Sequence, residues 1–421
     1  MTTTASAAQR ARPTRPGFRL ATLLAVVGPG LLAGLSDDDP AGITTYSVLG
    51  AQYGYQLLWV LLLSTVALVL FHNLGARMGV ATGQGLIGLV RDRFGIRLGA
   101  LAMLFLLVAN LGTTCAEFAG VAAGFMLFGV PPYLSVPGAA ILVSVLVLKG
   151  SFPRVEHLLT ALAAVFVAYF AAGVVVGPDW EQAATGLVVP SMPLTRDAVV
   201  IVAATVGTTL APWGLSFIQS YAVDKKLTPA DLKYERVDVV AGSLLTGIIG
   251  LFVVVTCAAT LFARNLTITS AADSARALEP LAGRFASQLF GLGLIGAALL
   301  AAAILPLSTA YSVSEFTGQE GAIDDGFRRA PLFYSTYLFV TVVAAGAVLI
   351  PGIPLVPVLV LTQVLNAVLL LPLLIFIYLL SRDSDLMGKH RASRGGSAAY
   401  LLTIGLIAVC VLGLLALTIS P

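Results

Sequence analysis

The sequence is poor in charge and in cysteine, and each shortage excludes a class of protein. Only 11% of its 421 residues are charged, whereas a soluble domain carries about 25%, so a chain solvated on all sides is excluded. Cys115, Cys257 and Cys410 lie far apart inside apolar runs, which predicts small packing residues rather than disulfides or metal thiolates. The loops contain no His-Glu hydrolase spacing, nucleophile elbow or phosphate loop. We therefore expect no enzyme, no bound cofactor and no nucleic-acid partner.

The sequence is correspondingly rich in apolar residues. The chain is 58% hydrophobic, with a mean hydropathy of +0.95. Runs of about 20 apolar residues, each long enough to cross a bilayer, recur along it. The sequence therefore predicts an all-α polytopic membrane protein embedded in the lipid bilayer. We predict eleven spans, near 20–53, 56–79, 97–128, 134–149, 157–177, 197–223, 236–263, 285–315, 331–350, 355–381 and 397–419.

The basic residues indicate how these spans are oriented. If the N-terminus lies inside, 20 of the 24 basic residues fall on the cytoplasmic side. Only Arg196, Arg264, Arg276 and Arg284 then lie outside. The positive-inside rule favours this arrangement, with a cytoplasmic N-terminus and an external C-terminus in the plasma membrane. The oligomeric state stays open, and a monomer is compatible with the sequence.

The same pattern divides the chain into segments. Residues 1–19 are polar, basic and proline-containing, without a cleavable signal pattern, and predict a disordered cytoplasmic tail. A transporter core is expected over 20–381, as two five-helix halves of about 20–177 and 197–381. A cytoplasmic loop (382–396) and an eleventh transmembrane helix (397–421) follow.

Two of the predicted spans are interrupted in the middle. GLSDDDPAGIT (34–44) interrupts the first span, and GTTLAPWG (207–214) interrupts the sixth. Proline removes a helical hydrogen bond and glycine makes unwinding cheap. Either proline alone can be a simple kink. Because the two breaks occupy corresponding positions in the two halves, they favour an inverted repeat with substrate bound where both helices unwind.

Three consecutive aspartates, Asp37, Asp38 and Asp39, occupy the first break. A carboxylate near the bilayer centre costs at least about 2.5 kcal/mol, and neighbouring carboxylates repel one another. A water-filled vestibule would solvate them, whereas a bound divalent cation would offset both costs. Their place at an unwound helix centre favours the cation site, with one aspartate facing the ion.

These residues resemble the NRAMP family of divalent metal transporters. GPGLLAGLSDDDPAGITTYSVLGAQYGYQLLW is similar to the first helix of the family, and LGARMGVATGQGLIGLVRDRFG and TTCAEFAG to its second and third helices. The resemblance covers spans one to ten. It implies a leucine-transporter-like fold, with a 5+5 inverted repeat and broken helices 1 and 6, and transport by alternating access.

The resemblance also places the family's metal-binding motifs on this chain. The Asp-Pro-Gly-Asn motif of helix 1 corresponds to Asp39, Pro40, Ala41 and Gly42, and the Met-Pro-His motif of helix 6 to Ala211, Pro212 and Trp213. The family's Asn and Met ligands are thus replaced by Gly42 and Ala211. The loss of the soft thioether removes discrimination against hard ions, and a roomier oxygen site suits a partly hydrated Mg²⁺. The chain resembles the NRAMP-related magnesium transporter branch.

Further contacts follow from the same alignment. It places the backbone carbonyls of Ser36 and Thr208 near the ion. Gln363 and Asn366 in helix 10 are candidates for additional polar contacts, although an interhelical hydrogen bond would equally explain them.

Other departures from the family make proton coupling less expected for this chain. Helix 3 keeps Glu117 but has Thr114 where a second acid would stand, and Trp213 replaces the histidine. Glu117 is a functional candidate, although a structural hydrogen bond is an equal alternative. His72 is predicted to be a hydrogen-bonded packing residue. We therefore expect uncoupled, downhill import of Mg²⁺, and also of Mn²⁺.

Three rival functions remain. The nearest is a proton-coupled Mn²⁺/Fe²⁺ importer with a rearranged site. The second is a cation-coupled carrier of organic solutes, which three aspartates disfavour for an anionic substrate. A membrane-embedded enzyme or a sensor is disfavoured because the sequence contains no catalytic motif and no extramembrane domain.

Overall fold

The structure, a computed structural model, describes residues 34, 36–149, 168–319, 321 and 326–419. Within these residues every regular element is helical. The first half contains α3 (Pro40–Tyr53), α4 (Leu58–Thr82), α5 (Leu86–Phe94), α6 (Ile96–Met126), α7 (Pro132–Leu148), α9 (Ala168–Val175) and α10 (Trp180–Val188). The middle contains α11 (Arg196–Thr209), α12 (Pro212–Asp224), α13 (Leu232–Thr260), α14 (Ala271–Ala275), α15 (Glu279–Ala282) and α16 (Ala286–Thr317). The last part contains α17 (Gly326–Arg329), α18 (Pro331–Val348), α19 (Leu355–Arg382), α20 (Ser384–Met387) and α21 (Arg394–Ile419).

Short 3₁₀ turns complete the helical connections. Between α13 and α16 they are η2 (Phe262–Arg264), η3 (Arg276–Leu278) and η4 (Gly283–Phe285), and between α20 and α21 lies η6 (Gly388–His390). Local chemistry explains many of the helix ends. Pro40, Pro132, Pro212 and Pro331 stand in the first turn of their helices, where the missing N–H costs nothing. Gly83 and Gly318 close α4 and α16 with φ of 66° and 72°, a backbone conformation that favours glycine.

Eight helical segments of the described chain are long and apolar enough to cross a membrane. They are Leu58–Thr82, Ile96–Met126, Arg196–Asp224, Leu232–Arg264, Ala271–Thr317, Pro331–Val348, Leu355–Arg382 and Arg394–Leu417, with Pro132–Leu148 as a shorter apolar helix. These nine segments coincide with nine of the eleven predicted spans. The first and fifth predicted spans lie partly outside the described residues. The predicted tail 1–19 lies entirely outside them.

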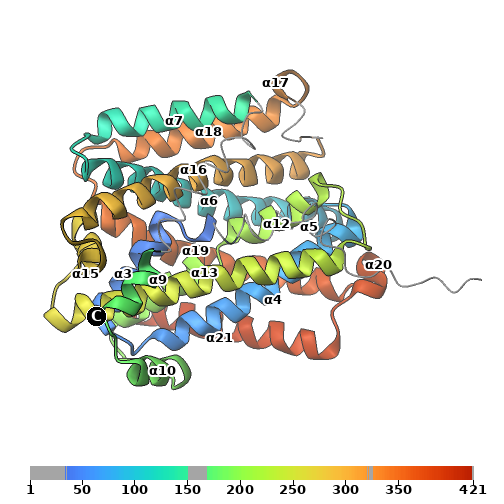
Figure 1. The fold of residues 1–421 in the computed structure, drawn as a ribbon. Coiled ribbons are helices and arrows are strands. Elements are labelled where there is room, and N and C mark those ends of the chain that lie inside the picture. The colour runs from blue at the N-terminus through green and yellow to red at the C-terminus, as the bar shows by residue number, and fades with distance from the viewer. Residues whose placement is uncertain (1–33, 35, 150–167, 320, 322–325, 420–421) are drawn as a thin grey trace, which may run out of the picture.

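The helices pack in layers around the broken pair. Helices α7, α18, α16 and α6 run side by side along one side of the molecule, and α13, α4 and α21 along the other (Figure 1). Between these layers lie α3 and α12, each in contact with α6 and each one half of an interrupted span. Helix α19 packs against α11, α6 and α3, and so closes the central region from a third side.

Small residues allow these close approaches. Gly120 of α6 faces Pro40 so closely that a Cβ would lie 2.3 Å from the proline Cβ. Gly247 of α13 likewise faces Thr65 of α4, and a Cβ at Gly247 would lie 2.5 Å from Thr65 Cγ2. Such contacts let helices associate without a hydrophobic driving force in lipid. They bring the break in the first span against α6, which carries Glu117.

The segments that were predicted to connect the spans contain additional short helices. Helix α10 occupies the segment between the fifth and sixth spans, α5 follows α4, and α20 with η6 falls within the predicted loop 382–396. Asp179 caps α10 by accepting a hydrogen bond from the Gln182 backbone N–H (2.9 Å). Helices α5 and α10 have nine residues each, too few to cross a bilayer, which is why a span-by-span prediction omits them.

Candidate functional site

The first break lies at Asp38 and Asp39. Ser36 and Asp37 are helical, Asp38 and Asp39 form a bend, and α3 starts at Pro40. Asp39 is the N-cap of α3, and its Oδ1 accepts a hydrogen bond from the Gly42 backbone N–H. The positive end of the α3 dipole stabilises a carboxylate at this position. Asp39 is therefore held in one orientation by the helix that it begins.

The other two aspartates have no such partner. Asp37 and Asp38 are 1% and 3% exposed, and within the described chain their carboxylate oxygens accept no hydrogen bond. The Ser36 hydroxyl is also buried and unpartnered there. Buried carboxylates of this kind need a compensating charge or proton. The first break therefore concentrates uncompensated oxygen groups inside the protein.

The second break separates α11 from α12. Helix α11 ends at Thr209, and α12 starts at Pro212 with Ala211 as an N-cap that has no side-chain hydrogen bond. The last carbonyls of a helix have no intrahelical partner and carry the negative end of its dipole. The Thr208 hydroxyl is buried and also lacks a partner among the described residues. Tyr46 of α3 joins this break to the first one through a hydrogen bond to Thr209 Oγ1 (2.9 Å).

Gly42 marks the point where the two breaks meet. A Cβ at this position would lie 2.8 Å from the Asp37 carbonyl oxygen, and 3.2 Å from both Asp39 Oδ1 and Thr208 Oγ1. Three oxygens from two interrupted helices thus surround one glycine. The carbonyl found here belongs to Asp37, the residue after Ser36, and Thr208 presents its hydroxyl. Sequence alignment alone missed this use of Asp37.

Ala211 and Trp213 lie on the apolar side of the site. Ala211 is 3% exposed and belongs to a hydrophobic cluster with Ala41, Ala116 and Trp213. The Trp213 ring packs against Phe217, with centroids 6.1 Å apart, and its backbone carbonyl accepts a hydrogen bond from Ser308 Oγ (3.2 Å). Neither position supplies a side-chain nitrogen or sulfur ligand, and the side-chain atoms nearest to a Cβ placed at Gly42 are oxygens.

Helix α6 brings Glu117 to the first break. Glu117 is fully buried, and its carboxyl lies near enough to that of Asp39 for the two to influence each other electrostatically, although neither Glu117 oxygen forms a hydrogen bond within the described chain. Thr114, one turn earlier, donates its hydroxyl hydrogen bond to the Asn110 carbonyl of its own helix (2.7 Å), so it does not reach the aspartates. Of the two helix-3 positions singled out from the sequence, the structure brings only Glu117 to Asp39.

Gln363 and Asn366 form a polar link between helices. Asn366 Nδ2 donates hydrogen bonds to Gln363 Oε1 (2.8 Å) and to Thr113 Oγ1 of α6 (2.9 Å). The Gln363 backbone carbonyl closely approaches Gly207 of α11. This geometry matches the interhelical alternative expected for the pair. Asn366 Oδ1 also accepts a hydrogen bond from Thr113 Oγ1 (3.2 Å), so within the described chain the Asn366 side chain bonds only to Gln363 and Thr113.

His72 differs from its prediction. It is buried in α4, but neither ring nitrogen forms a hydrogen bond within the described chain. A Cβ at Gly214 would lie 3.2 Å from His72 Nε2 and 3.7 Å from Asp37 Oδ1. The burial of His72 agrees with the expected packing residue, but the expected hydrogen bond is not found within the described residues. The packing of α4 against α12 places His72 beside the site.

The C-terminal half of α12 contacts α16 and the segment before α5, and α5 in turn contacts α16. Ser220 donates a hydrogen bond to Glu315 Oε1, and Gln219 Nε2 donates to the Gln84 carbonyl (2.9 Å). Arg91 of α5 donates to the last carbonyls of α16, those of Glu315 (3.0 Å) and Phe316 (2.6 Å). These contacts hold α12, one half of an interrupted span, against its neighbours.

Among the described residues, no three His, Cys, Asp or Glu side chains form a ready-made metal cluster. A cation between the two breaks would instead need a few carboxylates, hydroxyls, carbonyls and its own waters, the ligands of hard ions. Two interrupted helices that meet at a buried acidic site inside an apolar helical bundle define a membrane transporter of the broken-helix type.

Comparisons with known proteins agree with this class. The family model described as "Natural resistance-associated macrophage protein-like" (Nramp) matches residues 30–417. The divalent metal cation transporter MntH of Burkholderia ambifaria is 28% identical over 88% of this chain and 84% of its own length. The chain belongs to the Nramp family, whose members are transporters rather than enzymes, as predicted.

Solved structures show the same architecture. The manganese transporter of Eremococcus coleocola superposes with a TM-score of 0.76 and 18% identity, over 96% of this chain and 88% of that one. Mhp1, a nucleobase-cation-symport-1 family transporter, superposes with a TM-score of 0.58 and 17% identity, over 93% and 91%. At these identities the likeness shows the fold alone. The predicted leucine-transporter-like fold, with broken helices 1 and 6, is confirmed.

Proposed function

We propose that the protein imports divalent cations by alternating access, with Mg²⁺ as its principal substrate and Mn²⁺ as a second one, and without proton coupling. The observation that carries the proposal is that the three atoms nearest to a Cβ placed at Gly42 are all oxygens. A Cβ placed at Gly42 would lie within 3.2 Å of three oxygens, those of the Asp37 carbonyl, the Asp39 carboxylate and the Thr208 hydroxyl. Mg²⁺ prefers oxygen ligands and retains several waters when bound.

The replaced ligands support a hard ion. Gly42 and Ala211 correspond to the Asn and Met of the family motifs, so neither an amide nor a thioether is present. Soft ligands select transition metals, and their absence favours Mg²⁺ over them. An Nramp-related magnesium transporter is the branch that this reasoning favours. Mn²⁺ also accepts oxygen ligands and remains a second substrate in the proposal.

Each site residue then has a proposed role. Asp39 anchors the ion, Asp37 and Asp38 provide negative charge around it, and carbonyls near Ser36 and Thr208 contribute further oxygen. Pro40 and Pro212 keep the two helices interrupted, and Trp213 closes the apolar wall. Gln363 and Asn366 contact the hydrated ion only if their link to α6 opens.

The proposed topology follows the basic residues. The N-terminal tail (1–19) and the loop 382–396 lie in the cytoplasm, the C-terminus lies outside, and the core (20–381) and final helix (397–421) lie in the plasma membrane. Inward movement of a divalent cation is then favoured by the membrane potential, by about 2.3 kcal/mol per charge per 100 mV.

Uptake by purified protein in liposomes, measured with an internal Mg²⁺ dye, tests the proposal. We expect Asp39→Asn to abolish uptake, because asparagine preserves the helix cap and removes only the charge. Asp179→Asn is the matched control, since Asp179 caps the exposed helix α10 in the same way. Absence of wild-type uptake, or undiminished uptake in Asp39→Asn, would contradict the proposal.

A proton-coupled Mn²⁺/Fe²⁺ importer is the second candidate. The interaction of Glu117 with Asp39, and the position of His72 beside Asp37 and Gly214, favour it. The names of the two metal transporters compared above are in line with it as well. A pH-sensitive dye inside the same liposomes separates the two functions, since proton influx stimulated by Mn²⁺ supports coupling. Strong Cd²⁺ transport in excess Mg²⁺ would also favour this candidate, because Cd²⁺ is a soft ion.

A cation-coupled carrier of organic solutes is the third. The fold that it shares with Mhp1 supports it, whereas the buried aspartates disfavour an anionic substrate.

A further inference from the structure

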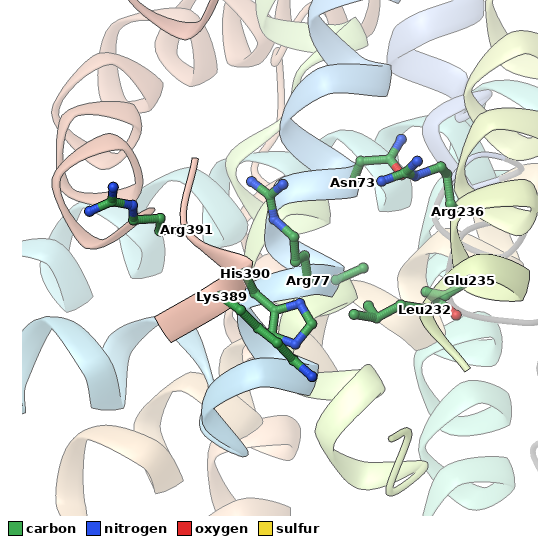
Figure 2. Close-up of a pocket in the computed structure, with 9 residues that line it drawn as sticks. Asn73, Arg77, Leu232, Glu235, Arg236, Lys389, His390 and Arg391 are labelled. Atoms are coloured by element: carbon green, nitrogen blue, oxygen red, sulfur yellow. The ribbon is translucent and has the colours of Figure 1, made fainter. Parts of the chain in front are cut away.

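A second polar cavity lies away from the broken helices. It has a volume of about 250 Å³ and is formed by α4, α13 and the η6 turn with the residue that follows it. Its charged lining consists of Arg77, Glu235, Arg236, Lys389, His390 and Arg391. In Figure 2, Lys389 and His390 lie together below Arg77, Glu235 lies across the cavity beside Leu232, and Arg391 points away on the opposite side.

The lining contains unpartnered groups of both signs. Glu235 is 1% exposed, and neither of its carboxylate oxygens forms a hydrogen bond within the described chain. Arg77 Nε and His390 Nε2 are likewise buried without a partner there. A buried charge without a partner is costly. The cavity thus presents unsatisfied donors and an unsatisfied acceptor to the same space.

This charge pattern excludes a cation path through the cavity. Arg77, Arg236 and Lys389 would repel a divalent ion along its walls. A simple anion would satisfy these cations but would leave the Glu235 oxygens without a hydrogen bond, and the attraction of Lys225 for this carboxylate is offset by the repulsion of Asp238. A ligand that carries both a phosphate and a primary ammonium group satisfies both kinds of group at once. The volume holds about eight water-sized groups, which is the size of a phosphoethanolamine headgroup.

One face of α4 connects this cavity with an apolar groove. Trp59, Leu63, Val66 and Leu70 line a groove of about 640 Å³ between α4, α11 and α21. The same three- and four-residue spacing continues to Asn73 and Arg77, so all six positions lie on one helix face. Arg77 is about 10 Å along the helix from Leu70, and a lipid acyl chain reaches roughly 15 Å, half the bilayer core.

We propose that the cavity binds the headgroup of an aminophospholipid, phosphatidylethanolamine, with its phosphate between Arg77 and Lys389 and its ammonium group at Glu235. One acyl chain follows the apolar face of α4. Basic pockets between membrane helices are established binding places for lipid phosphates. The buried carboxylate is what distinguishes this pocket, because it selects a headgroup with N–H donors.

Lipid binding to the purified, delipidated protein tests the proposal. Native mass spectrometry would compare phosphatidylethanolamine, phosphatidylglycerol and phosphatidylcholine of identical acyl chains. We expect phosphatidylethanolamine to bind tightest to the wild type. Glu235→Gln should reverse its order with phosphatidylglycerol, and Lys389→Gln, at an exposed position, should weaken both by about fivefold. Arg284→Gln, a basic residue outside the cavity, should leave all three affinities unchanged.

The other outcomes overturn the proposal. Equal binding of phosphatidylcholine and phosphatidylethanolamine to the wild type would remove the role of the ammonium group. A preference for phosphatidylethanolamine that survives Glu235→Gln would place the lipid elsewhere. Soluble phosphoethanolamine or inorganic phosphate that binds as tightly as the lipid would assign the cavity to a free metabolite. If Glu235→Gln does not fold, the wild-type order and Lys389→Gln still decide the question.

Discussion

Substitution of Gly42 by alanine is the sharpest test of the site geometry. The new Cβ would lie 2.8 Å from the Asp37 carbonyl oxygen, closer than a Cβ can stand, so backbone at the first break must shift. It would also press on Asp39 Oδ1 and Thr208 Oγ1, each 3.2 Å away. Overpacking of this kind costs about 1–3 kcal/mol. If that cost falls on the ion-bound state, the apparent affinity for Mg²⁺ decreases about 5- to 150-fold.

The assay is Mg²⁺ uptake into liposomes at several ion concentrations, with equal amounts of reconstituted protein. Gly346→Ala in α18 is the matched control, because no atom lies within 4 Å of its added Cβ. Both variants replace a helical glycine in a membrane helix, so the general gain in helix propensity is shared. A Gly42→Ala protein with the wild-type concentration dependence and rate would refute the assignment of these three oxygens to the ion.

Three further outcomes follow from the described contacts. Ala211→Met should increase inhibition of Mg²⁺ uptake by Cd²⁺ severalfold, whereas Ala211→Leu, of similar size but without sulfur, should not; competition assays in liposomes decide this. Glu315→Gln should weaken the hydrogen bond that Ser220 donates to it, a charge-assisted bond worth about 1.5–3 kcal/mol. Backbone amides of α12 should then exchange their hydrogens faster, and an unchanged exchange rate would show that this bond does not hold α12 in place. A double-mutant cycle of Asn366→Leu and Thr113→Val should give about 0.6 kcal/mol of coupling in unfolding experiments, and zero coupling would contradict the interhelical link.

The positions of the helix breaks could be predicted from sequence. Pro40 and Pro212 cannot donate the backbone hydrogen bond of a continuous helix, and the helices α3 and α12 do begin at these residues. The charge count and the apolar runs likewise predicted nine helical spans that the structure contains. These features depend on local chemistry, so a linear pattern carries them.

The surroundings of the breaks could not be predicted in the same way. The approach of the Asp37 carbonyl to Gly42 and the position of His72 beside Gly214 depend on how distant helices cross. No sequence rule predicts that His72 lies near Gly214, since the two residues belong to different spans. The cavity at Arg77 also assembles from three separate elements. Tertiary packing, rather than motif spacing, determines all three arrangements.

The three aspartates differ in what holds them, and this difference constrains the transport cycle. Asp39 is stabilised by the first turn of α3 whether or not an ion is present, because its partner is the Gly42 backbone N–H. Asp37 and Asp38 have no hydrogen-bond partner in the described chain, and each buried carboxylate costs about 2.5–3.5 kcal/mol at mid-membrane. A cation offsets that cost in the closed protein, whereas an empty closed site bears it in full. Under the proposed function, release of the ion therefore favours entry of water or a proton, and the two carboxylates proposed to attract the cation disfavour closure of the transporter without one.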